Sequence, residues 1–206
     1  MASSVHWGLL WQGRCGDIVD AASTPDSRDD PIIVLAAAWS GRAGLAERAW
    51  EGMSPARRPL PQAVFARASL DVVHGRLREA QQGLHRGSDA AHATGMHTQF
   101  EVLAAWAALR AGEAAQVVAA LWPGLVELDG PERRAISEWA RLVLGLALLE
   151  LERPADAVDV LGPALEPMLR ARRLLMVTAT GYALAEARLR VGDAAAARLV
   201  LADVRD

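Results

Sequence analysis

The stretch "VHGRLREAQQ", Val73 to Gln82, decides the fold because the same short pattern of residues recurs along the whole chain. Gly75 and a polar residue separate two apolar-periodic stretches, and Ala80 follows shortly afterwards. Successive occurrences are about 28 to 40 residues apart, which is the period of helical-hairpin repeats. The other occurrences are "GRCGDI" from Gly13, "GRAGLA" from Gly41, "GEAAQV" from Gly112, "ERPADA" from Glu152 and "GDAAAA" from Gly192.

Each occurrence of this pattern is expected to form the turn of a helical hairpin. Glycine adopts the left-handed conformation that closes a helix, and the polar residue after it begins the next helix in water. Apolar residues recur at helical spacing on both sides, as in "ISEWARLVLGLALLEL". The sequence therefore predicts about six helix-turn-helix units, with turns near residues 13, 41, 75, 112, 152 and 192.

Residues at matching distances from the turns are expected to form the contacts inside each hairpin. Small or slender residues at these positions let the paired helices approach closely, and a larger residue further on fills the next layer. Five residues after the turns stand Ile18, Ala46, Ala80, Val117, Ala157 and Ala197, and seven before them stand His6, Val34, Ala68, Ala105, Gly145 and Ala185. The larger residues are Trp50, Leu84, Leu121, Leu161 and Leu201.

This arrangement resembles the tetratricopeptide repeat. The fifth unit matches best, with Leu144, Gly145, Leu148, Ala157, Leu161 and Ala164 in the family's positions. The resemblance implies an all-α fold, in which residues 1–206 form one repeat domain wound into a right-handed superhelix. The units are also similar to those in the helical sensor segments of LuxR-type and MalT-like bacterial regulators.

Composition excludes several classes of function. All 22 basic residues are arginine, so the chain has neither a Schiff-base lysine nor the lysine of a phosphate-binding P-loop. The formal charge is −3 and the arginines are scattered, so direct contact with nucleic acid is not expected. A single cysteine, no signal sequence and no membrane-length apolar run predict a cytoplasmic setting without membrane contact.

Two further features are expected to shape the helices. Pro123 and Pro163 stand at matching positions in second helices, which are expected to kink or stop there. The stretch "STPDSRDDP", residues 23–31, is predicted to be a loop whose aspartates, Asp26, Asp29 and Asp30, keep it soluble and cap the next helix.

No set of residues predicts catalysis, a metal site or a cofactor. Cys15 and His6 would lie on different helices without a third group, so Cys15 is expected to be an inert thiol. His97 and Glu101 are spaced as two metal ligands on a helix, but two ligands do not complete a site, and a solvated face is the simpler interpretation. We therefore expect a protein that is not an enzyme.

The aromatic residues indicate a binding surface. In the family, first helices line the concave face of the stack, and the resemblance places polar residues there, Arg110, Glu150 and Glu186 among them. The aromatic residues implied at this stripe are Trp7, Trp11, Trp39, Phe65, Trp106, Trp139 and Tyr182. An apolar wall carrying a few polar groups is typical of ligand pockets. Packing between neighbouring first helices is the alternative; Trp50 and Trp122, on second helices, are expected in the core in either case.

The repeat resemblance and the aromatic stripe lead us to expect one of two functions. The first is a non-catalytic sensory module, the regulatory part of a bacterial transcriptional regulator, which binds an apolar or aromatic small molecule or a peptide on the aromatic stripe. The second is an adaptor that offers its surface to a segment of another protein. Neither end of the chain carries an evident polar capping helix, so we expect either a segment of a longer regulator or a homodimer formed through the ends.

Overall fold

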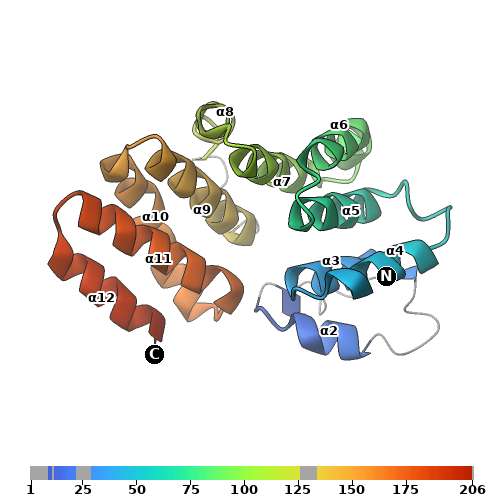
Figure 1. The fold of residues 1–206 in the computed structure, drawn as a ribbon, viewed down its shortest axis with the longest axis horizontal. Coiled ribbons are helices and arrows are strands. Elements are labelled where there is room, and N and C mark those ends of the chain that lie inside the picture. The colour runs from blue at the N-terminus through green and yellow to red at the C-terminus, as the bar shows by residue number, and fades with distance from the viewer. Residues whose placement is uncertain (1–8, 11, 22–28, 126–133, 206) are drawn as a thin grey trace. The chain divides into compact units, whose positions relative to one another are not determined.

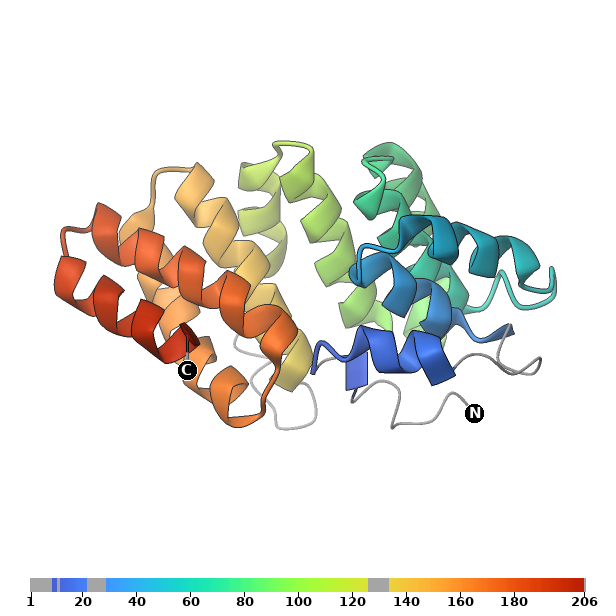
Figure 2. The ribbon, with the colours of Figure 1, turned by 60° about the horizontal axis from the view of Figure 1, so that its bottom comes forward.

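The computed structural model describes residues 9–10, 12–21, 29–125 and 134–205, and within these ranges the regular structure is helical, with no strand. The chain divides into two compact units, Met1–Ala111 and Gly112–Asp206. Figures 1 and 2 show how, within each unit, successive helices fold back on one another. The predicted all-α class is therefore confirmed, whereas the right-handed superhelix stays a prediction.

The first unit contains helices that pack on their neighbours in sequence. Helix α2 packs on α3, α3 on α4, α5 on α6 and α6 on α7. The alternate helices α3, α5 and α7 also touch in order, so the first helix of each hairpin contacts the next first helix. The helices are α2 (Cys15–Ala21), α3 (Pro31–Trp39), α4 (Ala43–Gly52), α5 (Pro61–Val73), α6 (Leu77–Ala93) and α7 (His97–Arg110).

The second unit repeats this pattern. Each helix packs on the one that follows it, and α9 also packs on α11. None of the described helices of the chain is both long and apolar enough to cross a bilayer. The helices of this unit are α8 (Ala114–Leu121), α9 (Arg134–Glu150), α10 (Pro154–Arg170), α11 (Leu174–Arg190) and α12 (Ala194–Arg205).

The residues at the predicted turn positions share one backbone conformation. Left-handed backbone occurs at all six, with φ between 54° at Glu152 and 86° at Gly192. At Gly75 the turn closes as a Schellman motif, in which the Gly75 amide donates to the Val72 carbonyl at 3.1 Å and the Arg76 amide to that of Asp71 at 2.8 Å. Gly95 and Arg172 adopt the same conformation between successive hairpins.

The positions that the sequence assigned to the hairpin interfaces are buried. All six residues placed five positions after a turn are at most 1 % exposed. Those placed seven before a turn are buried too, apart from His6, which lies outside the described residues. One close approach is at Gly145, where an added Cβ would stand 2.5 Å from the Leu161 side chain.

Helix boundaries follow local chemistry at both ends of several helices. Asp30 caps α3, because its carboxylate accepts the Ile32 amide at 3.0 Å and Pro31 opens the helix, as predicted. Helix α8 ends at Leu121, just before Pro123. Asp26 lies outside the described residues.

Helix α10 does not stop at its proline, although a stop was one of the two outcomes expected there; the expected kink stays a prediction. It continues through Pro163 and Pro167 to Arg170. A proline leaves backbone carbonyls of the preceding turn without their usual partners. In this part of α10, the Val160 carbonyl accepts a bond from the Arg141 guanidinium at 3.3 Å.

The expected core positions of two tryptophans are wrong. Trp122 is 40 % exposed, because α8 has ended and Trp122 serves as its C-cap. The Arg153 guanidinium covers its ring, 5.4 Å from the centroid. Trp50 is only partly buried, and it faces a pocket rather than the interior.

Candidate functional site

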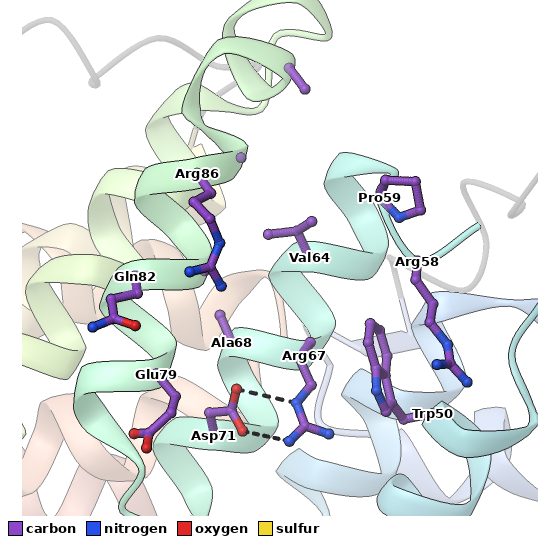
Figure 3. Close-up of a pocket in the computed structure, with 13 residues that line it drawn as sticks. Trp50, Arg58, Pro59, Val64, Arg67, Ala68, Asp71, Glu79, Gln82 and Arg86 are labelled. Carbon is purple, nitrogen blue, oxygen red and sulfur yellow. Dashed lines mark hydrogen bonds and ion pairs between the residues drawn. The ribbon is translucent and has the colours of Figure 1, made fainter. Parts of the chain in front are cut away.

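A pocket of about 540 Å³ lies in the first unit, between α5 and α6, and reaches the end of α4. Figure 3 shows Val64 and Ala68 of α5 on one side, with Glu79, Gln82 and Arg86 of α6 on the other. Because these residues come from three consecutive helices and the segment between α4 and α5, the local hairpin packing alone builds this pocket.

The floor of the pocket is apolar and made of small side chains. Gly83, Gly87 and Ala90 line it from α6, opposite Val64 and Ala68 of α5. A Cβ at Gly83 would meet nothing within 4 Å. A Cβ at Gly87 would instead stand 3.0 Å from the side chains of Val64 and Phe100. Gly83 therefore leaves open space on this face of α6, whereas Gly87 lets α6 approach its neighbours closely.

Trp50 forms the aromatic end of the pocket. The guanidinium groups of Arg58 and Arg67 each lie 5.5 Å from the centre of its rings, and Figure 3 shows the indole between them. This distance is within the range of cation–π attraction. Two cations thus hold the indole in a fixed orientation beside the apolar floor.

Arg67 is itself held by a network of charges. Its guanidinium donates to Glu47 at 3.0 Å and to Asp71 at 3.2 Å. Arg76 donates to the same two carboxylates at 2.7 and 2.8 Å. Two arginines and two carboxylates therefore neutralise each other and fix the Arg67 side chain against the tryptophan.

The network shifts the acidity of Glu47. Partial burial would raise the pKa of the Glu47 carboxyl, but the hydrogen bonds and charges of Arg76 and Arg67 outweigh it, so this pKa lies below its ordinary value. Glu47 stays ionised in mildly acidic solution. The cluster that supports Trp50 therefore persists down to the acid range.

The segment that carries Arg58 is anchored to the start of α3. The Ser54 amide donates to the Asp29 carboxylate at 2.7 Å, and Arg57 donates to the Asp29 carbonyl at 3.3 Å. Met53 is 1 % exposed. Asp29, predicted to keep a loop soluble, thus also fixes the wall of the pocket.

Two cations around the pocket have no carboxylate partner among the described residues. Arg58 donates to the backbone carbonyls of Met53 and Glu51, at 3.2 and 3.0 Å. Arg86 is exposed and has no ion pair within the described part of the chain. The pocket therefore offers an apolar floor beside two positive charges that are not neutralised by acidic groups.

The residues of the predicted aromatic stripe are divided between the two units. Trp7 and Trp11 lie outside the described residues. In the first unit, Trp39 and Trp106 are partly buried, Arg110 is exposed, and Phe65 is 1 % exposed, with its ring 6.1 Å from that of Phe100. Phe65 therefore packs inside the unit.

In the second unit the stripe residues have mixed environments. Trp139 is 8 % exposed, whereas Tyr182 is 60 % exposed. Glu150 and Glu186 are exposed, and Glu186 accepts a bond from Arg190 at 2.6 Å. None of the stripe residues that the structure describes lines the pocket at Trp50.

The residues of the Trp50 pocket were not predicted as a site. They come from the second helices α4 and α6, from the segment between α4 and α5, and from a face of the first helix α5 that carries none of the predicted stripe positions. One signal was present in the sequence: Gly83 and Gly87 are four residues apart within a helix, so they lie on the same face.

The other candidate groups take structural roles in the described residues. Cys15 is buried at 3 % exposure, and that burial raises the pKa of its thiol, which disfavours the reactive thiolate. His92 and His97 stack with ring centres 4.9 Å apart. No group of three metal-binding side chains occurs within the described ranges.

Comparisons with protein families, with curated proteins and with solved structures found no match to the chain. The resemblance to tetratricopeptide repeats accordingly stays a prediction based on the residues quoted above.

Proposed function

We propose that the chain is a non-catalytic binding module, and that the Trp50 pocket takes a peptide segment of a partner protein. The segment carries an apolar side chain next to an acidic one. The observation that carries this proposal is the apolar floor at α5 and α6 beside the unneutralised Arg58 and Arg86. The role within a transcriptional regulator rests on the family resemblance alone.

The length of the pocket favours a peptide. Its α6 side runs from Glu79 to Ala90, which is three turns of helix or about 16 Å. An extended chain spans this distance with about five residues, at roughly 3.3 Å per residue. A small aromatic molecule would fill only part of such a groove.

The chemistry of the lining sets the expected sequence of the peptide. A tryptophan and arginines are the residue types that dominate binding energy at protein interfaces. The apolar floor would bury an aliphatic or aromatic side chain, while Arg58 and Arg86 would pair with aspartate or glutamate. Peptides with lysine or arginine at the acidic position would be repelled.

A peptide-display selection on the full chain tests the proposal. We expect enrichment of short segments in which an apolar residue lies close to Asp or Glu. An enriched peptide should bind Arg86→Glu at least tenfold more weakly than the original chain, because the charge that it pairs with has been reversed. Arg86 is exposed, so the substitution leaves the fold intact.

Arg78→Glu is the matched control. Arg78 is also exposed on α6 but does not line the pocket. A selection that enriches no such segment, or enriched peptides that bind Arg86→Glu and the original chain equally well, would show that the pocket is not the binding site.

A further inference from the structure

The second unit contains another pocket, of about 320 Å³, between the two helices of one hairpin. From α9 it is lined by Arg134, Ser137, Glu138 and Arg141, and from α10 by Pro163, Ala164, Pro167 and Arg170. On each helix these residues recur at three- and four-residue spacing, so each set forms a single face. The pocket therefore follows the line of contact between α9 and α10.

The hairpin brings cations to both ends of this pocket. The helices are joined at the Glu152 turn, so residues equally distant from that turn lie across from each other. Arg134 and Arg170 are both at the end away from the turn. Arg141 is nearer the turn, where the Val160 carbonyl of α10 holds its guanidinium at 3.3 Å.

Among the described residues, Glu138 is the one carboxylate that lines the pocket, and it is paired with an arginine. Glu138 accepts bonds to both of its oxygens from Arg173, and the two side chains are 4 % and 18 % exposed. Arg170 pairs with Glu166 at 3.3 Å, and both of these side chains are largely exposed to water. The charge of Arg134 acts on the same Glu138 carboxyl and, like that of Arg173, works to lower its pKa against the effect of burial. The lining thus carries an excess of positive charge.

We propose that this pocket binds a compact oxyanion with two or more negative charges, namely a phosphate group or a dicarboxylate. Arg134 and Arg141 are two helical turns apart on one face of α9, about 10 Å along the axis. The planar guanidinium group matches the oxygens of both anions in a two-bond arrangement. This site shares no residue with the Trp50 pocket, so it does not depend on the function proposed above.

The buried pair behind the pocket keeps the site cationic. Arg173 binds both oxygens of Glu138, so this carboxylate is engaged mainly by a cation outside the lining, although the charge of Arg134 also acts on it. Pro163 and Pro167 contribute no backbone N–H, so α10 offers the ligand no amide donor at these two positions, and the arginines are the donors on which binding depends.

The proposal is tested by calorimetric titration of the full chain with inorganic phosphate and, separately, with succinate, each in buffer of matched ionic strength. We expect saturable binding of at least one of them. Arg134→Gln should weaken that binding at least tenfold, since Arg134 is exposed and its replacement leaves the fold unchanged. Preference for phosphate or for succinate identifies which kind of anion the site takes.

Arg141→Gln is the second variant, and Arg198→Gln is the matched control on α12, away from the pocket. Circular dichroism confirms that each variant is folded. Absence of binding by both anions would overturn the proposal. Equal binding by Arg134→Gln, Arg141→Gln and the original chain would overturn it as well, because the anion would then lie elsewhere.

Discussion

At the scale of single residues, the Trp50 pocket depends on a chain of contacts rather than on one group. Glu47 and Asp71 hold Arg67, and Arg67 together with Arg58 holds the indole. Charge-assisted hydrogen bonds of this kind are stronger than neutral ones. Replacing Glu47 should therefore make the orientation of the Trp50 indole less fixed, although Glu47 does not line the pocket.

Glu47→Gln is expected to destabilise the chain by about 1 kcal/mol at neutral pH, because a charge between two arginines is lost. The effect should depend on pH. The folded-state pKa of Glu47 is lowered, so its stabilisation is complete above the ordinary value of about 4.5 and disappears as the pH falls through the lower, folded-state pKa. Urea unfolding of both proteins from pH 7 to pH 3 measures this. A constant difference across that range would contradict the assignment.

The sequence predicts the role of a single residue correctly where neighbouring residues in the chain determine that role. Asp30 caps α3 because a carboxylate before proline suits a helix start wherever it occurs. It failed for Trp50, whose helical position matches that of buried leucines in other hairpins. The environment of Trp50 is set by Arg58 and Arg67, which come from the following segment and helix. The spacing of apolar residues in α4 therefore cannot predict the environment of Trp50.

At the scale of helices and turns, the left-handed residues decide local stability. Gly75 has a φ of 74°, and Glu152 has a φ of 54° in the equivalent turn. We expect Gly75→Ala to destabilise the chain by about 1 kcal/mol, because a Cβ makes this conformation costly. Glu152→Gly should stabilise it by a similar amount for the same reason. Thermal unfolding of the two variants tests this, and shifts of the same sign would contradict the account.

Helix packing inside the fifth hairpin leaves no room for a side chain at Gly145. An added Cβ would lie 2.5 Å from the buried Leu161, and overpacking typically costs about 1–3 kcal/mol. This exceeds the gain of about 1 kcal/mol from replacing glycine within a helix. Gly145→Ala should therefore lower the melting temperature.

Gly83→Ala is the control for this prediction. Nothing lies within 4 Å of a Cβ at Gly83, so only the favourable helix propensity remains and the melting temperature should rise. A rise in both variants would show that the contact between Gly145 and Leu161 is looser than described.

Helices and turns were the most predictable part of the fold. The requirement at each is local: all six turn positions have a left-handed backbone, five of them at glycine, and the small residues expected at helix crossings are buried wherever they are described. The sequence left open whether α10 would kink or stop at Pro163, and the helix continues. Whether a helix survives a proline depends on its packing against neighbours, here α9 and α11, and those contacts are not encoded in the proline itself.

At the scale of the whole molecule, the chain carries two candidate sites in two compact units. Because they share no residue, we expect their binding energies to be independent. Arg86→Glu should leave phosphate or succinate binding unchanged, and Arg134→Gln should leave peptide binding unchanged. Titration of each variant with both kinds of ligand measures this. A substitution that weakens both ligands would indicate coupling between the units.

The sequence predicted the helical class of the molecule but not where it binds. Alanine and leucine at helical spacing determine the class, because they favour helices throughout the chain. The pockets depend instead on side chains that the hairpins bring together, such as Arg134 and Arg170. The predicted aromatic stripe was likewise not placed reliably by the sequence, because Phe65 packs inside its unit whereas Tyr182 is exposed.

The indole N–H resonance of Trp50 tests the central claim most directly. In a chain labelled with nitrogen-15 at tryptophan, Trp50→Phe assigns the resonance by its disappearance. On addition of a peptide from the display selection, the account predicts that the Trp50 resonance shifts with a saturating dependence on peptide concentration, while that of Trp122 in the second unit stays in place. A Trp50 resonance that does not move while the peptide binds would contradict the account.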